Sequence, residues 1–93
     1  MSKALYARIR KAAEILKAAG AKDVFLFGSA ASGSMRKDSD VDLAVTGLPP
    51  RNFFAAMGRA HDALGCSLDL VDLDEESPFT RHLKVEGALK RVG

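Results

Sequence analysis

The 93-residue chain is 47% hydrophobic and 28% charged with a formal net charge of +2, a composition typical of a folded globular domain and not of a disordered or collagen-like chain. It has no apolar stretch long enough to span a bilayer and no signal-peptide core, so we expect one cytoplasmic domain over residues 1–93. Its single cysteine, Cys66, excludes an internal disulfide and a cysteine-rich zinc site.

The first half of the chain predicts one helix and two strands. Apolar residues recur at helical spacing from Leu5 to Leu16, and Gly20 follows as a stop signal. Residues 1–22 contain six Lys or Arg residues and one Glu, so this helix has either a solvated basic face or a surface for phosphates or an acidic partner. The apolar run 24–27 and the alternating pattern over 41–45 predict the strands.

The second half predicts two more helices and two strands. Pro49 and Pro50 open a helix that Gly65 ends, and SLDLVDL over residues 67–73 is a third strand. Ser77 followed by Pro78 is a cap and first-turn pair for a last helix to about residue 86. The segment ALKRV, residues 88–92, predicts a short edge strand.

The turn after the first strand has the features of a phosphate-binding turn. Gly28 lets the backbone approach a ligand, and Ser29 caps a predicted helical turn over 30–34 whose free N–H groups suit a phosphate. It is not a P-loop, because Ser34 and Met35 replace the required Lys and Ser or Thr. An EF-hand is excluded as well, since Leu43 occupies the position of its invariant glycine.

Three aspartates on predicted strands form the second candidate feature. Alternation places Asp40 and Asp42 on one face, about 7 Å apart, and their like charges repel unless a cation lies between them. Asp69, in an otherwise apolar strand, is the third candidate. Oxygen ligands favour Mg²⁺ or Mn²⁺, and such a trio can hold two metal ions for in-line displacement at phosphorus. The alternative to a metal site is that Asp40 and Asp42 lie at the end of a strand and are simply exposed to solvent.

Gly28-Ser29, ten residues and then Asp40-Val-Asp42 resemble the signature of the DNA polymerase beta-like nucleotidyltransferases. More narrowly, the small size and the runs SGSMRKDSDVDLAV, LDLVDLDEESP and KVEGALKRV resemble the minimal nucleotidyltransferases. These are commonly the antitoxin half of pairs with HEPN-domain toxins. The resemblance implies an α/β fold, α+β in some schemes, in which helices flank a small mixed β-sheet.

The resemblance also implies which residues form the site. Gly28 and Ser29 would contact the β- and γ-phosphates of ATP, with Gly33 and Arg36 as further phosphate-binding candidates in the same turn.

By the same resemblance, Asp40 and Asp42 would ligate two Mg²⁺ ions. Asp69 would ligate one of them and help to deprotonate the attacking hydroxyl. Asp72 is the rival for this third position, but it lies nearer the end of the strand.

The implied reaction is transfer of AMP from ATP to a hydroxyl, by resemblance a tyrosine of a partner HEPN toxin, in a hetero-oligomer or a homodimer. Many relatives have arginines where this chain has Ala30 and Ser32, which favours the alternative of an antitoxin that acts by binding alone. A small-molecule acceptor is a third reading. Phe54 could present one ring face to an adenine, and neither a membrane nor direct nucleic-acid binding is expected.

Overall fold

The computed structural model describes residues 3–28, 40–86 and 89–93. Its elements in chain order are α1 (Lys3–Ala18), β1 (Asp23–Phe27), β2 (Val41–Thr46), α3 (Pro50–Leu64), β3 (Leu68–Asp72), α4 (Pro78–Glu86) and β4 (Lys90–Arg91). These are the elements that the sequence predicts, with ends shifted by one or two residues. The expected helical turn over 30–34 lies outside the described residues.

The described strands form one mixed sheet in the order β3-β2-β1-β4. The central strand β1 runs antiparallel to both β2 and β4, whereas β2 and β3 are parallel. The parallel pair is possible because α3 carries the chain back along the sheet between β2 and β3. The expectation of a small mixed sheet flanked by helices is therefore confirmed.

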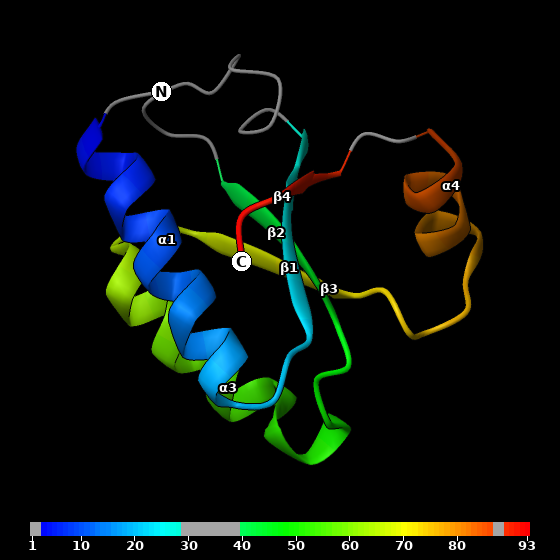
Figure 1. Ribbon diagram of the computed structural model, residues 1–93, viewed down its shortest axis with the longest axis horizontal. Coiled ribbons are helices and arrows are strands. Elements are labelled where there is room, and N and C mark those ends of the chain that lie inside the picture. The colour runs from blue at the N-terminus through cyan, green and yellow to red at the C-terminus, as the bar shows by residue number, and fades with distance from the viewer. Residues whose placement is uncertain (1–2, 29–39, 87–88) are drawn as a thin grey trace.

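The two faces of the sheet are covered differently (Figure 1). Helices α1 and α3 pack together over one face, and α4 stands beside the other. The main core lies beneath α1 and α3 and is built from apolar side chains of both helices and of the strands, among them Ile9, Leu16, Val24, Leu26, Val41, Leu43, Val45, Ala60, Leu64 and Leu70.

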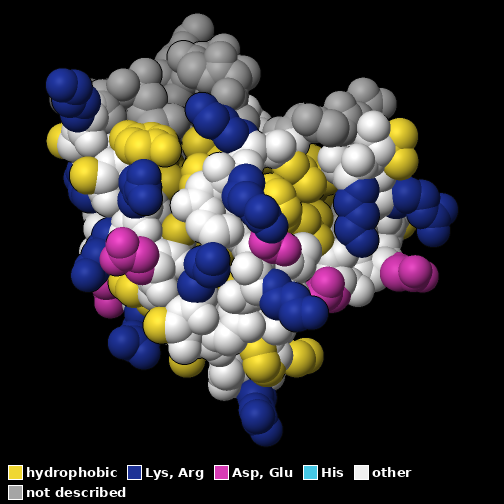
Figure 2. Space-filling model, viewed as in Figure 1, with side chains coloured by type: hydrophobic (Ala, Val, Ile, Leu, Met, Phe, Trp, Pro, Cys, Tyr) yellow, Lys and Arg dark blue, Asp and Glu magenta, His cyan; other side chains and the backbone are white. Residues whose placement is uncertain are grey.

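A second, smaller cluster lies on the α4 side of the sheet. Its buried members are Phe27, Ala44, Leu73 and Leu83, so α4 packs on the sheet through Leu83. In Figure 2 hydrophobic side chains gather in the hollow between the strands and α4.

The start of α4 is fixed by the cap that the sequence predicts. Ser77 Oγ accepts a hydrogen bond from the Thr80 backbone N–H at 3.1 Å. The Thr80 hydroxyl is buried and donates to the Glu75 carbonyl at 2.7 Å, which ties the first turn to the preceding loop. The orientation of the first-turn side chains is therefore set by hydrogen bonds as well as by packing.

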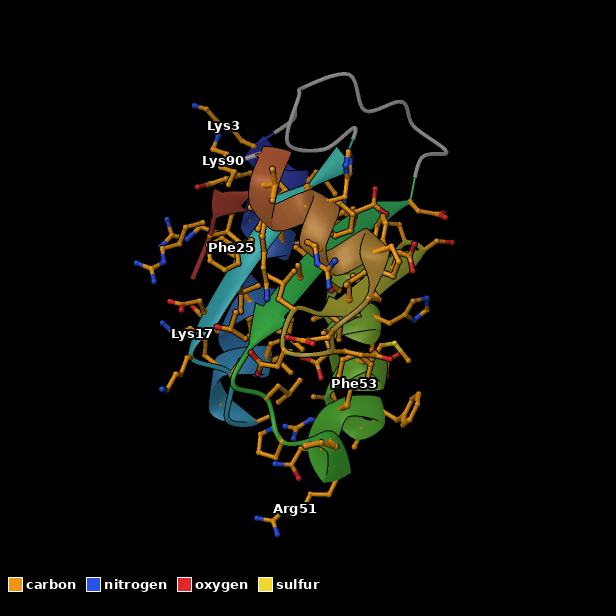
Figure 3. All side chains as sticks on the ribbon, turned by 90° about the vertical axis from the view of Figure 1, so that its right-hand side faces the viewer. Lys3, Lys17, Phe25, Arg51, Phe53 and Lys90 are labelled. Carbon is orange, nitrogen blue, oxygen red and sulfur yellow. The ribbon has the colours of Figure 1, made fainter. Side chains whose placement is uncertain are left out.

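Basic side chains project into solvent around the sheet. Lys3, Lys17 and Lys90 extend from the same side of the molecule in Figure 3, and Lys and Arg side chains are spread over the face seen in Figure 2. Within the described part of the chain, no helix is both long enough and apolar enough to cross a membrane.

Candidate active site

Three residues from three strands form one row across the sheet. Phe27 of β1 pairs with Asp42 of β2, and Asp42 pairs with Asp69 of β3. Paired residues of neighbouring strands project from the same face of a sheet, about 5 Å apart. The sheet register therefore places side by side two aspartates that are far apart in the sequence.

This row lies on the α4 side, at the edge of what α4 covers. The next row, Ala44 paired with Val71, belongs to the cluster that Leu83 of α4 packs against. Asp42 is only half-buried and Asp69 is exposed. The two carboxylates are therefore open to a ligand at the point where the cover of the helix ends.

Asp40 immediately precedes β2 and is exposed. Burial raises the pKa of Asp42 above its ordinary value of 3.8, and the negative charges of Asp69 and then Asp40 raise the pKa of Asp42 further. Both acids thus act on Asp42. A cation bound among the three would relieve this repulsion.

Gly28 lies directly against the Asp42 carboxylate. Its φ of +69° is in the left-handed region that favours glycine, and a Cβ at this position would overlap Asp42 Oδ2. The backbone at the beginning of the expected phosphate turn is therefore in contact with the carboxylate row. The other expected phosphate ligands, Ser29, Gly33 and Arg36, lie outside the described residues.

Asp72 is separated from this row. It pairs with Val45, which belongs to the core beneath α1 and α3, and its Oδ1 accepts a hydrogen bond from the Asp74 backbone N–H at 2.9 Å. The register thus supports Asp69 over Asp72 as the third carboxylate, an assignment that stays a prediction.

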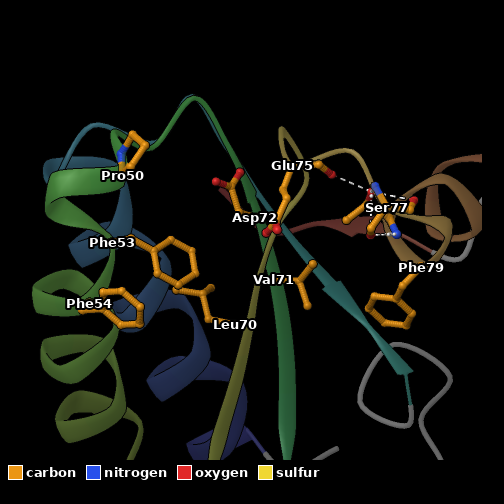
Figure 4. A pocket seen from close by; sticks show the side chains of 10 residues that line it. Pro50, Phe53, Phe54, Leu70, Val71, Asp72, Glu75, Ser77 and Phe79 are labelled. Atoms are coloured by element: carbon orange, nitrogen blue, oxygen red, sulfur yellow. Dashed lines mark hydrogen bonds between the residues drawn. The ribbon is translucent and has the colours of Figure 1, made fainter.

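A half-exposed aromatic ring borders the row and was not singled out from the sequence. Phe79, in the first turn of α4, has its ring centroid 6.2 Å from that of Phe27, at an interplanar angle of 63°. A cavity of about 390 Å³ runs along β3 between α3 and α4 and is lined by Val71 and Phe79 on one side and by Phe53 and Phe54 on the other (Figure 4). Only the position of α4 on the sheet brings Phe79 here.

The comparisons with known proteins agree with this geometry. The family model described as "Polymerase beta, Nucleotidyltransferase" matches residues 10–89. The chain belongs to this family. The search of curated proteins found no match to this chain.

Solved structures share its fold. The chain is 26% identical to a minimal nucleotidyltransferase, with a TM-score of 0.76 over 98% of this chain and 93% of that one. It is also 26% identical to a chain of a toxin–antitoxin complex determined with AMP-PNP, with a TM-score of 0.72 over 95% of this chain and 72% of that one.

A third similar structure contains a tri-AMPylated Shewanella oneidensis HEPN toxin in complex with its MNT antitoxin. The identity is 22% and the TM-score 0.68, over 96% of this chain and 71% of that one, so this likeness concerns the fold alone.

The candidate donor set of this chain fits a hard divalent cation. Asp40, Asp42 and Asp69 offer only carboxylate oxygens, which suit Mg²⁺. Over residues 3–28, 40–86 and 89–93, no three or more His, Cys, Asp or Glu side chains are already grouped as a metal site. Without a cation, repulsion favours rotamers that hold like charges apart; after burial, the charges of Asp69 and Asp40 are what raise the pKa of Asp42.

The raised pKa of Asp42 predicts a pH-dependent stability without metal. The folded state holds the carboxyl proton of Asp42 more tightly than the unfolded state does. The free energy of unfolding therefore falls as the pH rises from the ordinary pKa of 3.8 through the raised pKa of the folded state. Asp42→Asn removes the charge at position 42 and with it the cost of burying that charge beside Asp69 and Asp40. In EDTA near pH 7 we therefore expect the variant to be more stable than the native chain by about 0.2–1 kcal/mol. Urea unfolding of both proteins from pH 3 to 7 measures the difference in the free energy of unfolding. A difference that shrinks as the pH rises would contradict this prediction.

Proposed function

We propose that this chain, as one domain over 1–93, is an Mg²⁺-dependent nucleotidyltransferase that moves AMP from ATP to a hydroxyl. The acceptor that we propose is a tyrosine of a HEPN-type toxin, which this cytoplasmic protein silences as its antitoxin. The observation that carries the proposal is the pairing of Asp42 with Asp69 on adjacent strands, against the backbone of Gly28.

In the proposed reaction the acceptor oxygen attacks the α-phosphorus of ATP, a new P–O bond forms, and pyrophosphate leaves. Asp40 and Asp42 would hold the metal, and Asp69, beside Asp42 in the register, would take part in removing the hydroxyl proton. Bound Mg²⁺ would supply neutralisation of the charge on the phosphate oxygens. Gly28 would let the phosphates approach the backbone closely.

The partner is proposed from the similar structures. This chain is similar to chains of toxin–antitoxin complexes, one of which contains AMP-PNP and another an AMPylated HEPN toxin. The described residues form one sheet with its helices, and a protein acceptor would bring its own binding surface to this domain. A hetero-oligomer with the toxin follows from this proposal.

Labelled ATP tests the activity. With Mg²⁺ and the purified HEPN partner, label at the α-phosphate should appear on the partner, whereas label at the γ-phosphate should not. A Tyr→Phe change at the acceptor of the partner should abolish the transfer. Neutralisation of the toxin with no transfer of either label would replace this proposal by inhibition through binding alone.

A further inference from the structure

We propose that the base of the nucleoside triphosphate stacks on the ring of Phe79, in the part of the cavity between α4 and β3. This inference rests on the proposed function, because it assumes that the phosphates lie at the carboxylate row. It assigns Phe79 as a nucleotide-binding residue that sets affinity for the nucleotide.

The position of Phe79 follows from the rows of the sheet. Its ring packs on Phe27, which is in the same row as Asp42 and Asp69. Leu83, one turn further along α4, packs in the cluster that contains Phe27 and Ala44 of the neighbouring row. Phe79 therefore stands at the boundary between the covered rows and the open carboxylates, where a nucleotide held by its phosphates would extend its base.

The ring of Phe79 is both exposed and held in position, which favours stacking. Phe79 is 51% exposed, although its edge-to-face contact with Phe27 and the Ser77–Thr80 cap hold the first turn of α4 in place. An exposed, positioned aromatic side chain loses little freedom when a flat ligand covers it. With Val71 it lines one side of the cavity of about 390 Å³ that runs along β3. Because every base has a π-face, this platform would bind all four nucleotides.

Phe54 is the competing platform, and the structure argues against it. Although it is 75% exposed, it belongs to α3, which covers the opposite face of the sheet, and its ring packs on Phe53 with centroids 5.5 Å apart. In Figure 4 Phe54 and Phe79 lie on opposite sides of β3. Phe54, which the sequence left as a possible contact for adenine, is therefore the matched control.

Tryptophan fluorescence provides the test, because the chain contains no tryptophan. We expect ATP with Mg²⁺ to quench the fluorescence of Phe79→Trp at saturation and to leave that of Phe54→Trp unchanged. Inorganic tripolyphosphate, which has no base, should leave both unchanged. Quenching of Phe54→Trp that equals or exceeds that of Phe79→Trp would overturn the assignment.

Affinity gives the second readout. Phe79→Leu keeps an apolar contact with Phe27 but has no ring, and we expect it and Phe79→Ala to bind ATP about 5- to 100-fold more weakly while keeping their affinity for tripolyphosphate. Native ATP affinity in both variants would overturn this inference and leave AMP transfer standing. A native chain that binds neither ATP nor tripolyphosphate would overturn both proposals. Loss of partner binding with native ATP affinity would assign Phe79 to the interface instead.

Discussion

Asp42→Asn is expected to lower the rate of AMP transfer by at least about 10²–10³-fold, the loss that follows removal of one preorganised charge-stabilising group. Asp42 is the centre of the candidate site because it pairs with Asp69, lies two residues from Asp40 in sequence and lies against Gly28. The amide keeps the shape of the side chain but carries no charge to hold a cation. Initial rates of label transfer, with saturating ATP and partner, measure the effect.

The same variant should be at least as stable as the native chain in EDTA, so its loss of activity cannot be attributed to unfolding. Asp72→Asn is the matched control, because Asp72 pairs with Val45 and its carboxylate is engaged by the Asp74 backbone N–H. We expect Asp72→Asn to transfer AMP near the native rate and Asp69→Asn to be impaired. The reverse order of these two variants would move the third carboxylate to Asp72.

The second large effect is expected at Gly28. In Gly28→Ala the new Cβ meets Asp42 Oδ2, so the carboxylate must rotate away from its place in the row. A displacement of about 1 Å at a reacting centre costs about 10²-fold in rate. The left-handed backbone adds a loss of about 1–2 kcal/mol in the free energy of unfolding. Transfer rate and urea unfolding, measured on the same preparation, separate the two effects.

Gly65→Ala separates backbone strain from damage to the site. Gly65 has a φ of +74°, nearly that of Gly28, but it ends α3, and the nearest contact of an added Cβ is with the Arg8 guanidinium at 3.4 Å. We expect Gly65→Ala to lose similar stability and to keep its transfer rate. If Gly28→Ala were as active as Gly65→Ala, the contact between Gly28 and Asp42 would not contribute to the rate of AMP transfer.

Local patterns were sufficient to predict the elements and part of the site. Two-residue alternation around Val41 and Leu43 identified a strand with Asp42 on its less apolar face, and the Ser77-Pro78 pair marked the start of α4. These signals are local because they depend on the geometry of a few consecutive residues.

The remaining features depend on how the elements pack. That Asp69 rather than Asp72 pairs with Asp42 is set by the register of two parallel strands joined through α3, and a slip of one residue would reverse the faces of β3. The place of Phe79 depends on the docking of α4 through Leu83. Neither contact has a local pattern in the sequence, and for this reason Phe79 was not singled out from the sequence.

Anomalous diffraction from Mn²⁺ tests the central claim most directly, in crystals grown with an ATP analogue whose α–β bridge cannot be hydrolysed. The account predicts Mn²⁺ density in contact with the carboxylates of Asp40 and Asp42 and next to Asp69, with the phosphates beside Gly28. Mn²⁺ bound at Asp72 and Asp74, with Asp42 and Asp69 unligated in the presence of the nucleotide, would contradict it.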